Sequence, residues 1–267
     1  MIDPLDVLYE APGLPAFDLP DELATLYGGT LGLAEPRLYA NFVATADGVV
    51  AIPSIPSSNK LIAGGSAADR FVMGLLRACA DALVIGSGTL TASPRSVWTA
   101  EQAFPDLAEP FAELRRRIGR TAGPETVVLS ASGTVDPAHP ALEAGALIVT
   151  TDDGAARLAG RLPAAATAIS IGAGPTLDPA ATVALLGNRG HRLILSEGGP
   201  NAIGPFLAAG LVDELFLTVS PVLAGRLASP RPGLVDGVEL LPGTRVAPAL
   251  RSLRRGGDHL FARYAFR

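Results

Sequence analysis

The residues best suited to chemistry lie where a buried strand meets a helix, in residues 192–206. The apolar run Leu193-Ile194-Leu195 predicts a short strand, and it is followed by Ser196-Glu197-Gly198-Gly199-Pro200 and then by helical sequence. A helix start presents backbone N–H groups and a positive dipole end, and glycine lets a ligand approach the backbone. The stretch therefore predicts a phosphate site, with a plain strand–helix turn as the competing interpretation.

Carboxylates and further glycine turns accompany this stretch. Glu197 ends a buried strand, where a carboxylate costs desolvation unless it meets a partner. Other acids, Asp47 and Asp69, and glycine turns at 86–89 and 172–175 lie elsewhere in the chain. The sequence contains no G-x-G-x-x-G, no G-x-x-x-x-G-K and no G-x-S-x-G motif. A nucleotide held mainly by backbone amides fits these features.

Apolar runs alternate with helical patterns, which predicts an α/β fold with a mostly parallel, twisted sheet and helices on both faces. Strands are expected at 37–47, 49–52, 81–85, 126–130, 146–150, 167–171, 193–195 and 213–223. Two final strands, 245–254 and 258–266, predict an antiparallel C-terminal hairpin. Right-handed crossovers should bring the strand ends at Gly86, Thr150, Gly172 and Glu197 to one crevice.

Composition narrows the classes of partner. The 267 residues carry a net charge of −5 without a basic block, which argues against a nucleic-acid partner. No apolar run reaches about 18 residues, so we expect no membrane span, and the start does not resemble a signal peptide. The single cysteine, Cys79, fits a reducing, cytoplasmic compartment. With only three histidines besides, it also argues against a zinc site.

The first 36 residues differ from the remainder. They carry prolines at 4, 12, 15, 20 and 36 and one predicted helix at 21–27. We expect residues 1–36 to be an N-terminal extension that packs on a single domain formed by residues 37–267.

Five motifs, taken in order, resemble the reductase domain of the riboflavin-biosynthesis deaminase-reductases. They are Asn41–Gly48, Asp69–Arg77, Ala80–Thr89, Ser196–Pro200, and Asp213-Glu214-Leu215 with Ser220-Pro221. The resemblance runs from about Arg37 to Arg267. It implies the dihydrofolate reductase-like fold, a homodimer, NADPH as cofactor and reduction of a small molecule, the ribose of a phosphoribosylamino-pyrimidinone. The zinc deaminase half of that family has no counterpart in this sequence.

The resemblance also implies roles for individual residues. Ala44 and Thr89 align with cofactor-contacting positions, and Gly199–Gly204 align with the turn that holds the cofactor pyrophosphate. With the glycine strand ends, the predicted cofactor-binding set is Ala44, Gly86, Gly88, Thr89, Gly172, Gly198, Gly199, Pro200, Asn201, Ala202, Ile203 and Gly204. The predicted substrate-binding set is Asp47, Asn59, Asp69, Arg77 and Glu197, of which Asp69 and Glu197 are also predicted to be catalytic.

The chain departs from the family pattern on the substrate side. After Thr89 the family usually continues toward an Asp-Pro and a substrate-binding arginine, whereas residues 92–98 here read Ala-Ser-Pro-Arg-Ser-Val-Trp. The loop near Asn59 lacks the usual tryptophan. Asp69 stands where the biosynthetic enzymes seldom have a carboxylate, and in a few relatives it resembles the pteridine-binding acid of dihydrofolate reductase. It equally fits a helix-capping box that begins at Ser66. Arg77 equally fits a cation at a helix C-terminus, and Asp47 a turn.

Two functions remain open at this point. One is an NADPH-dependent reductase acting on a pyrimidine-like or pteridine-like molecule. The other is an NADPH-binding protein that no longer reduces anything, because the substrate loops have changed while the cofactor motifs have not.

Overall fold

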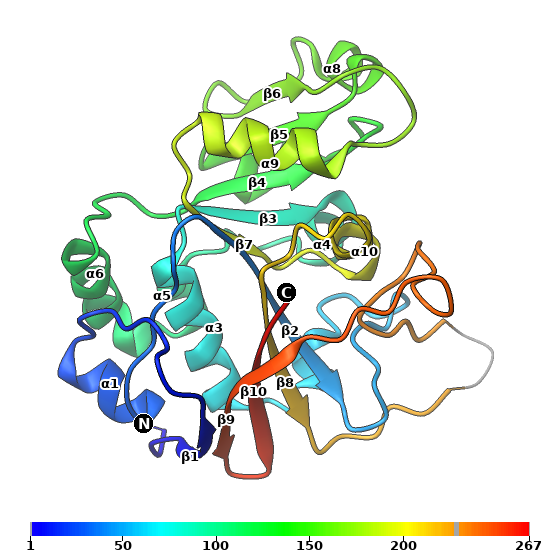
Figure 1. The fold of residues 1–267 in the computed structure, drawn as a ribbon. Coiled ribbons are helices and arrows are strands. Elements are labelled where there is room, and N and C mark those ends of the chain that lie inside the picture. The colour runs from blue at the N-terminus through cyan, green and yellow to red at the C-terminus, as the bar shows by residue number, and fades with distance from the viewer. Residues whose placement is uncertain (1, 227–229, 267) are drawn as a thin grey trace.

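The computed structural model describes residues 2–226 and 230–266, and in these residues ten strands form one sheet. The sheet order is β1-β9-β10-β8-β2-β7-β3-β4-β5-β6 (Figure 1). The strands are β1 (Asp6–Glu10), β2 (Arg37–Thr45), β3 (Ala82–Gly86), β4 (Glu125–Leu129), β5 (Leu147–Thr150), β6 (Thr167–Ser170), β7 (Leu193–Ser196), β8 (Glu214–Ser220), β9 (Ala249–Gly256) and β10 (His259–Ala265).

The sheet is mostly parallel, as predicted. Strands β8, β2, β7, β3, β4, β5 and β6 run parallel to one another. The hairpin of β9 and β10 adds antiparallel to β8, and β1 adds antiparallel to β9. The predicted dihydrofolate reductase-like arrangement, with its antiparallel C-terminal hairpin, is confirmed.

Helices cover both faces of the sheet. They are α1 (Asp21–Tyr27), α2 (Asn59–Ile62), α3 (Ala67–Cys79), α4 (Ser87–Ala92), α5 (Ala100–Ala103), the 3-10 turn η1 (Pro105–Leu107), α6 (Ala108–Arg117), α7 (Pro140–Glu143), α8 (Asp152–Leu158), α9 (Pro179–Asn188) and α10 (Pro200–Ala208). One buried cluster lies under α1, α3 and α6 and includes Phe71 and Phe111; the other lies under α9 and α10 and includes Leu186 and Phe206. Each face of the sheet thus has its own apolar core.

Helix α3 carries the predicted residues Asp69 and Arg77. Its buried side includes Phe71, Leu75 and Cys79, spaced as an amphipathic helix requires. The Ser66 hydroxyl accepts from the Asp69 backbone N–H at 3.2 Å, so the predicted N-cap is present. The cap uses the backbone of Asp69 and leaves its carboxylate available for another contact.

Two parts of the chain differ from the prediction. Residues 6–10, among the first 36 residues, form the edge strand β1, although the sequence predicts no strand there. Residues 49–52 form no strand. The Thr45 backbone N–H donates to the Val49 carbonyl at 2.9 Å, and the Thr45 hydroxyl accepts from the Val49 N–H at 2.9 Å. Gly48, at φ +82°, closes this turn, so the chain reverses before a strand can form.

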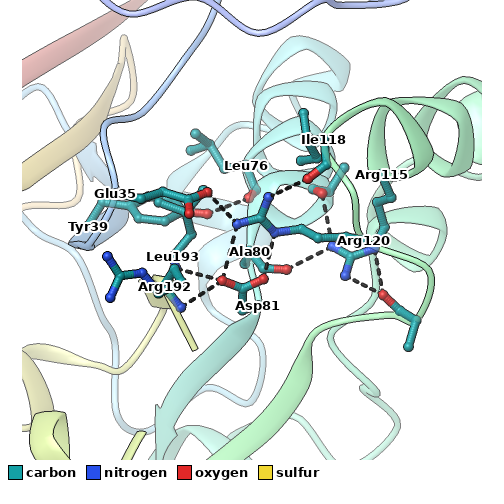
Figure 2. A network of polar contacts seen from close by, with 12 residues as sticks. Glu35, Tyr39, Leu76, Ala80, Asp81, Arg115, Ile118, Arg120, Arg192 and Leu193 are labelled. Carbon is teal, nitrogen blue, oxygen red and sulfur yellow. Dashed lines mark hydrogen bonds and ion pairs between the residues drawn. The ribbon is translucent and has the colours of Figure 1, made fainter. Parts of the chain in front are cut away.

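The amino ends of the central strands are joined by a network of charged groups (Figure 2). Asp81, just before β3, accepts from the Arg120 guanidinium at 2.6 Å and from the Leu193 backbone N–H at 2.7 Å. Arg120 also donates to Glu35 at 2.7 Å, and Arg115 donates to the Ala80 carbonyl at 2.8 Å. This network fastens α6 and the chain that follows it to the starts of β3 and β7.

Candidate active site

The turn between β7 and α10 is the centre of the candidate site. The Glu197 N–H donates to the Val84 carbonyl at 2.9 Å, which continues the β7–β3 pairing to the rim of the sheet. A Cβ at Gly198 would lie 2.7 Å from the Ala202 Cβ, so only glycine fits there. The Gly199 N–H donates to the Thr89 hydroxyl at 3.2 Å, which joins this turn to α4.

Helix α10 begins in a form that suits an anion. Gly199 is its N-cap and supplies no side chain to accept from the first-turn amides, and Pro200 occupies the first turn. Helix α4, whose N-cap is Gly86, also lacks a side-chain cap, and it lies beside α10 (Figure 1). A Cβ at Gly86 would lie 3.3 Å from the Ala202 Cβ. The structure therefore brings Gly86, Thr89, Gly198 and Gly199 together at the ends of β3 and β7.

The remaining predicted cofactor residues have mixed positions. Ala44, near the end of β2, is buried in the same apolar cluster as Ile203. Gly88 and Asn201 are exposed in the first turns of their helices. Gly172 follows β6, and two strands, β4 and β5, separate β6 from β3, so it lies roughly 14 Å along the rim. The expected convergence of four strand ends is thus confirmed for Gly86 and Glu197 alone.

A segment between β8 and β9 packs against α10. The Asp236 N–H donates to the Pro200 carbonyl at 3.4 Å. A Cβ at Gly204 would lie 2.5 Å from the Asp236 carbonyl oxygen, and one at Gly237 would lie 3.1 Å from the Asn201 Oδ1. Gly204 is therefore required for packing against this segment, whatever else the start of α10 binds.

Glu197 and Arg77 are brought together in a buried ion pair. Arg77 Nε donates to Glu197 Oε1 at 3.0 Å, and Nη2 donates to Oε2 at 2.6 Å. The two side chains are only 8% and 9% exposed. Arg77 Nη1 donates to the Thr99 carbonyl at 3.1 Å. All three nitrogens of the Arg77 guanidinium thus have partners within the protein. Arg77 is also the partner that the buried Glu197 carboxylate was expected to need.

Asp69 lies on the same side of the sheet as this ion pair. Burial raises the pKa of the Asp69 carboxyl, and a hydrogen bond with the Thr218 hydroxyl and the nearby His259 oppose that shift without reversing it; Glu197 adds to the rise. Thr218, in β8, is buried. A half-buried acid with a raised pKa and a neighbouring carboxylate is suited to holding and transferring a proton.

Asp47 and Asn59 have different surroundings. The Asp47 carboxylate accepts from the Thr45 hydroxyl at 2.5 Å and from the Gly225 and Ala224 amides at 2.8 and 3.1 Å. These hydrogen bonds, that from Thr45 foremost, lower the Asp47 pKa to about 2. Asp47 thus ties the turn after β2 to the loop after β8, in keeping with the turn interpretation. Asn59 is exposed at the start of α2.

Sequence reasoning missed three contributors to this region. Thr218 gave no signal, because a threonine in a strand is common and its partner Asp69 is remote in sequence. The contacts of Asp236 and of the Thr99 carbonyl are made by backbone atoms, which no residue type reveals. Thr218 could have been identified only by knowing how β8 packs against α3.

Neither a metal centre nor a membrane span is found in the described part of the chain. Residues 2–226 and 230–266 contain no group of three or more His, Cys, Asp or Glu side chains arranged to hold a metal ion. Across the same residues, no helix has both the length and the apolar character needed to cross a membrane.

The sheet order and the strand–turn–helix junctions at its rim define a dihydrofolate reductase-like α/β protein. The family model described as the RibD C-terminal domain matches residues 36–254. The chain belongs to this RibD C-terminal domain family. Among curated proteins, none matches the sequence significantly.

Solved structures share the fold at low identity. A pyrimidine reductase-like protein of Corynebacterium diphtheriae matches with a TM-score of 0.63 and 20% identity, covering 94% of this chain and 96% of that one. Acinetobacter baumannii RibD matches with a TM-score of 0.63 and 18% identity, covering 91% of this chain and 60% of that one. The Saccharomyces cerevisiae riboflavin biosynthesis reductase Rib7 matches with a TM-score of 0.59 and 15% identity, covering 92% of this chain and 98% of that one. The chain thus spans three fifths of A. baumannii RibD but nearly all of the other two.

Proposed function

We propose that this protein is an NADPH-dependent reductase of a small molecule related to the pyrimidine substrates of its family. The observation that carries the proposal is the start of α10, which has no side-chain cap and lies beside Gly86 and Thr89 at the ends of β3 and β7. Backbone amides at such a helix start can hold the pyrophosphate of a dinucleotide. Homology to riboflavin biosynthesis reductases supports the choice of cofactor.

When bound, NADPH supplies the hydride, so the protein has to orient donor and acceptor. Gly199 and the first turn of α10 would hold the pyrophosphate, and Ala44 and Thr89 would line the cofactor site. Glu197, fixed by Arg77, would accept hydrogen bonds from the substrate at the junction with the cofactor. Asp69 would carry the proton that accompanies reduction, because its raised pKa favours the protonated form.

The test is NADPH oxidation, followed by the loss of its absorbance, with 5-amino-6-(5-phosphoribosylamino)uracil as substrate. This compound is named for the Thermotoga maritima reductase, whose fold is similar (TM-score 0.63) at 15% identity. We expect turnover that Glu197→Gln reduces and that Asp153→Asn, a change at an exposed acid in α8, leaves intact. Absence of turnover with this and related pyrimidines would contradict the proposal.

A second candidate is reduction of a pteridine such as dihydrofolate. The observation that favours it is the pairing of the Asp69 carboxyl with the Thr218 hydroxyl, which presents an acid suited to an aminopyrimidine edge. Dihydrofolate turnover that Asp69→Asn abolishes, with Asp153→Asn unaffected, would support it. Cofactor binding without oxidation on either substrate would instead favour a catalytically silent NADPH-binding protein.

A further inference from the structure

The loop before α5 contains a strained turn that contacts Arg77. Trp98 has φ +52°, a left-handed conformation that is costly for a bulky side chain. Its indole is buried and stacks on the His139 ring, with 5.8 Å between centroids. The next residue, Thr99, turns its carbonyl to Arg77 Nη1 at 3.1 Å. The strain therefore lies one residue from an atom that holds the Arg77–Glu197 pair.

One side chain holds this turn closed. The Gln102 Oε1 accepts from the Val97 N–H at 2.9 Å and from the Trp98 N–H at 3.1 Å, and its Nε2 donates to the Arg95 carbonyl at 3.2 Å. The Gln102 N–H in turn donates to the Thr99 hydroxyl at 3.3 Å, which caps α5. Gln102 thus makes four hydrogen bonds to residues 95–99, although its side chain is on the surface.

We infer that Gln102 is a positioning residue for Glu197. By fixing the turn at Trp98 it fixes the Thr99 carbonyl, which orients the Arg77 guanidinium and through it the Glu197 carboxylate. The inference rests on the proposed function, in which Glu197 contacts the substrate. It also gives a role to residues 92–98, one of the stretches in which this chain departs from the pattern of the family it resembles. That stretch would help to position Arg77 and would make no contact with the substrate.

The variant that tests this is Gln102→Ala, with two controls. Gln102→Glu keeps an Oε1 acceptor for the two backbone N–H groups but has no donor for the Arg95 carbonyl, so it should rescue most of the effect. Glu101→Ala changes the exposed neighbour in the same short helix. Because Gln102 and Glu101 are exposed, no substitution opens a cavity in the core, and we expect all three variants to fold. Gln102→Ala should lower the melting temperature only modestly, since the contacts that it removes lie within one surface turn.

The first readout does not depend on activity. In protein labelled with ¹⁵N-arginine, the Arg77 Nε–H signal, identified by its loss in Arg77→Lys, reports hydrogen exchange of the buried ion pair. We expect Gln102→Ala to accelerate this exchange roughly tenfold, as the loss of the three side-chain hydrogen bonds to the turn would allow. Glu101→Ala should exchange like wild type, and Gln102→Glu should exchange more nearly like wild type than like Gln102→Ala. Unchanged exchange in Gln102→Ala would overturn the inference.

The second readout is catalytic. On the substrate that wild type turns over, Gln102→Ala should lower kcat/KM roughly tenfold while the Kd for NADPH stays the same, since misplacement of a positioned group lowers reaction rate. Accelerated exchange with unchanged kcat/KM would overturn the positioning role. If wild type oxidises no NADPH, the proposed function fails instead, and the exchange experiment still decides whether Gln102 holds the ion pair.

Discussion

The two rims of the sheet treat their buried carboxylates differently. At the amino rim, burial raises the pKa of Asp81, but hydrogen bonds from Arg120 and from the Leu193 and Arg192 amides outweigh it, so the pKa is lowered (Figure 2). At the carboxyl rim, burial raises the pKa of Asp69, and the hydrogen bond with Thr218 does not compensate. The amino rim satisfies the charge of Asp81 internally. The carboxyl rim also pairs Glu197 with Arg77, but it keeps one carboxyl, that of Asp69, whose charged form is disfavoured.

The same contrast holds for backbone amides. At the amino rim, the Arg192 and Leu193 N–H groups donate to Asp81 at 2.8 and 2.7 Å. At the carboxyl rim, α10 starts without a side-chain cap. The positive end of the α10 dipole thus has no acceptor side chain of its own, which is in keeping with the anion site proposed at the carboxyl rim.

Breaking the ion pair at the carboxyl rim should have the largest effect. Arg77→Leu leaves the Glu197 carboxylate buried without its partner, and we expect a loss of about 4 kcal/mol in unfolding free energy, measured by urea denaturation. The double variant Arg77→Leu/Glu197→Leu should recover most of this stability. Both variants should lose NADPH oxidation. Recovery of turnover in the double variant would contradict the role given to Glu197.

Breaking the amino rim should affect stability alone. Asp81→Ala removes the partner of Arg120 and of two backbone amides, and we expect a loss of about 3 kcal/mol in unfolding free energy. Turnover of the folded fraction and the Kd for NADPH should not change. A weaker NADPH affinity in Asp81→Ala would show that the amino rim also affects cofactor binding, which would contradict the contrast between the two rims.

The predicted elements are those with strong local patterns, and the missed ones lack them. Helix α3 was predicted from its apolar spacing, and the central strands from apolar runs such as Leu193-Ile194-Leu195. Strand β1 was missed because all five of its residues are exposed and show no alternation. Residues 49–52 were predicted as a strand because valine and isoleucine favour strands, but the Thr45 hydrogen bonds close a turn there.

In the candidate site, too, the residues with a strong local pattern were predictable and the long-range contacts were not. The glycine turn and Glu197 stand out in the sequence, and the structure places Gly198, Gly199, Gly86 and Thr89 together. The partner of Glu197 could not be predicted by pattern alone, because Arg77 equally suited a helix C-terminus. Long-range pairing depends on the packing of α3 against the sheet, which local spacing does not encode.

The raised pKa of Asp69 makes a prediction about pH. Since burial raises the folded-state pKa of Asp69 above its ordinary value of 3.8, the wild type loses stability as pH rises through the folded-state pKa. Asp69→Asn removes this loss, so its melting temperature should exceed that of wild type at pH 7, and the difference should vanish below pH 3.8. The difference in melting temperature between Asp69→Asn and wild type should thus be larger at pH 7 than at acid pH. A smaller difference at pH 7 would contradict a pKa of Asp69 that burial raises.

The smallest effect is expected at Asp47, which behaves like the amino-rim acids although it lies at the carboxyl rim. Hydrogen bonds lower its pKa from the ordinary 3.8 to about 2. The carboxylate therefore stabilises the fold above pH 3.8, and this contribution is lost as pH falls through about 2. Asp47→Asn should lower the melting temperature slightly at pH 7 and much less near pH 2. Equal effects at both values would show that the carboxylate charge does not hold the loop at Ala224 and Gly225.

The central claim, that the carboxyl rim binds NADPH at the start of α10, is tested most directly by the Kd for NADPH of wild type and of Gly199→Val, measured by titration calorimetry. Gly199 has ordinary backbone angles, so valine should fold while its side chain obstructs the helix start. We expect at least about a hundredfold weaker binding in Gly199→Val, and wild-type binding in Gly187→Val, a matched change at an open position in α9. Equal NADPH affinity in wild type and Gly199→Val would contradict the account.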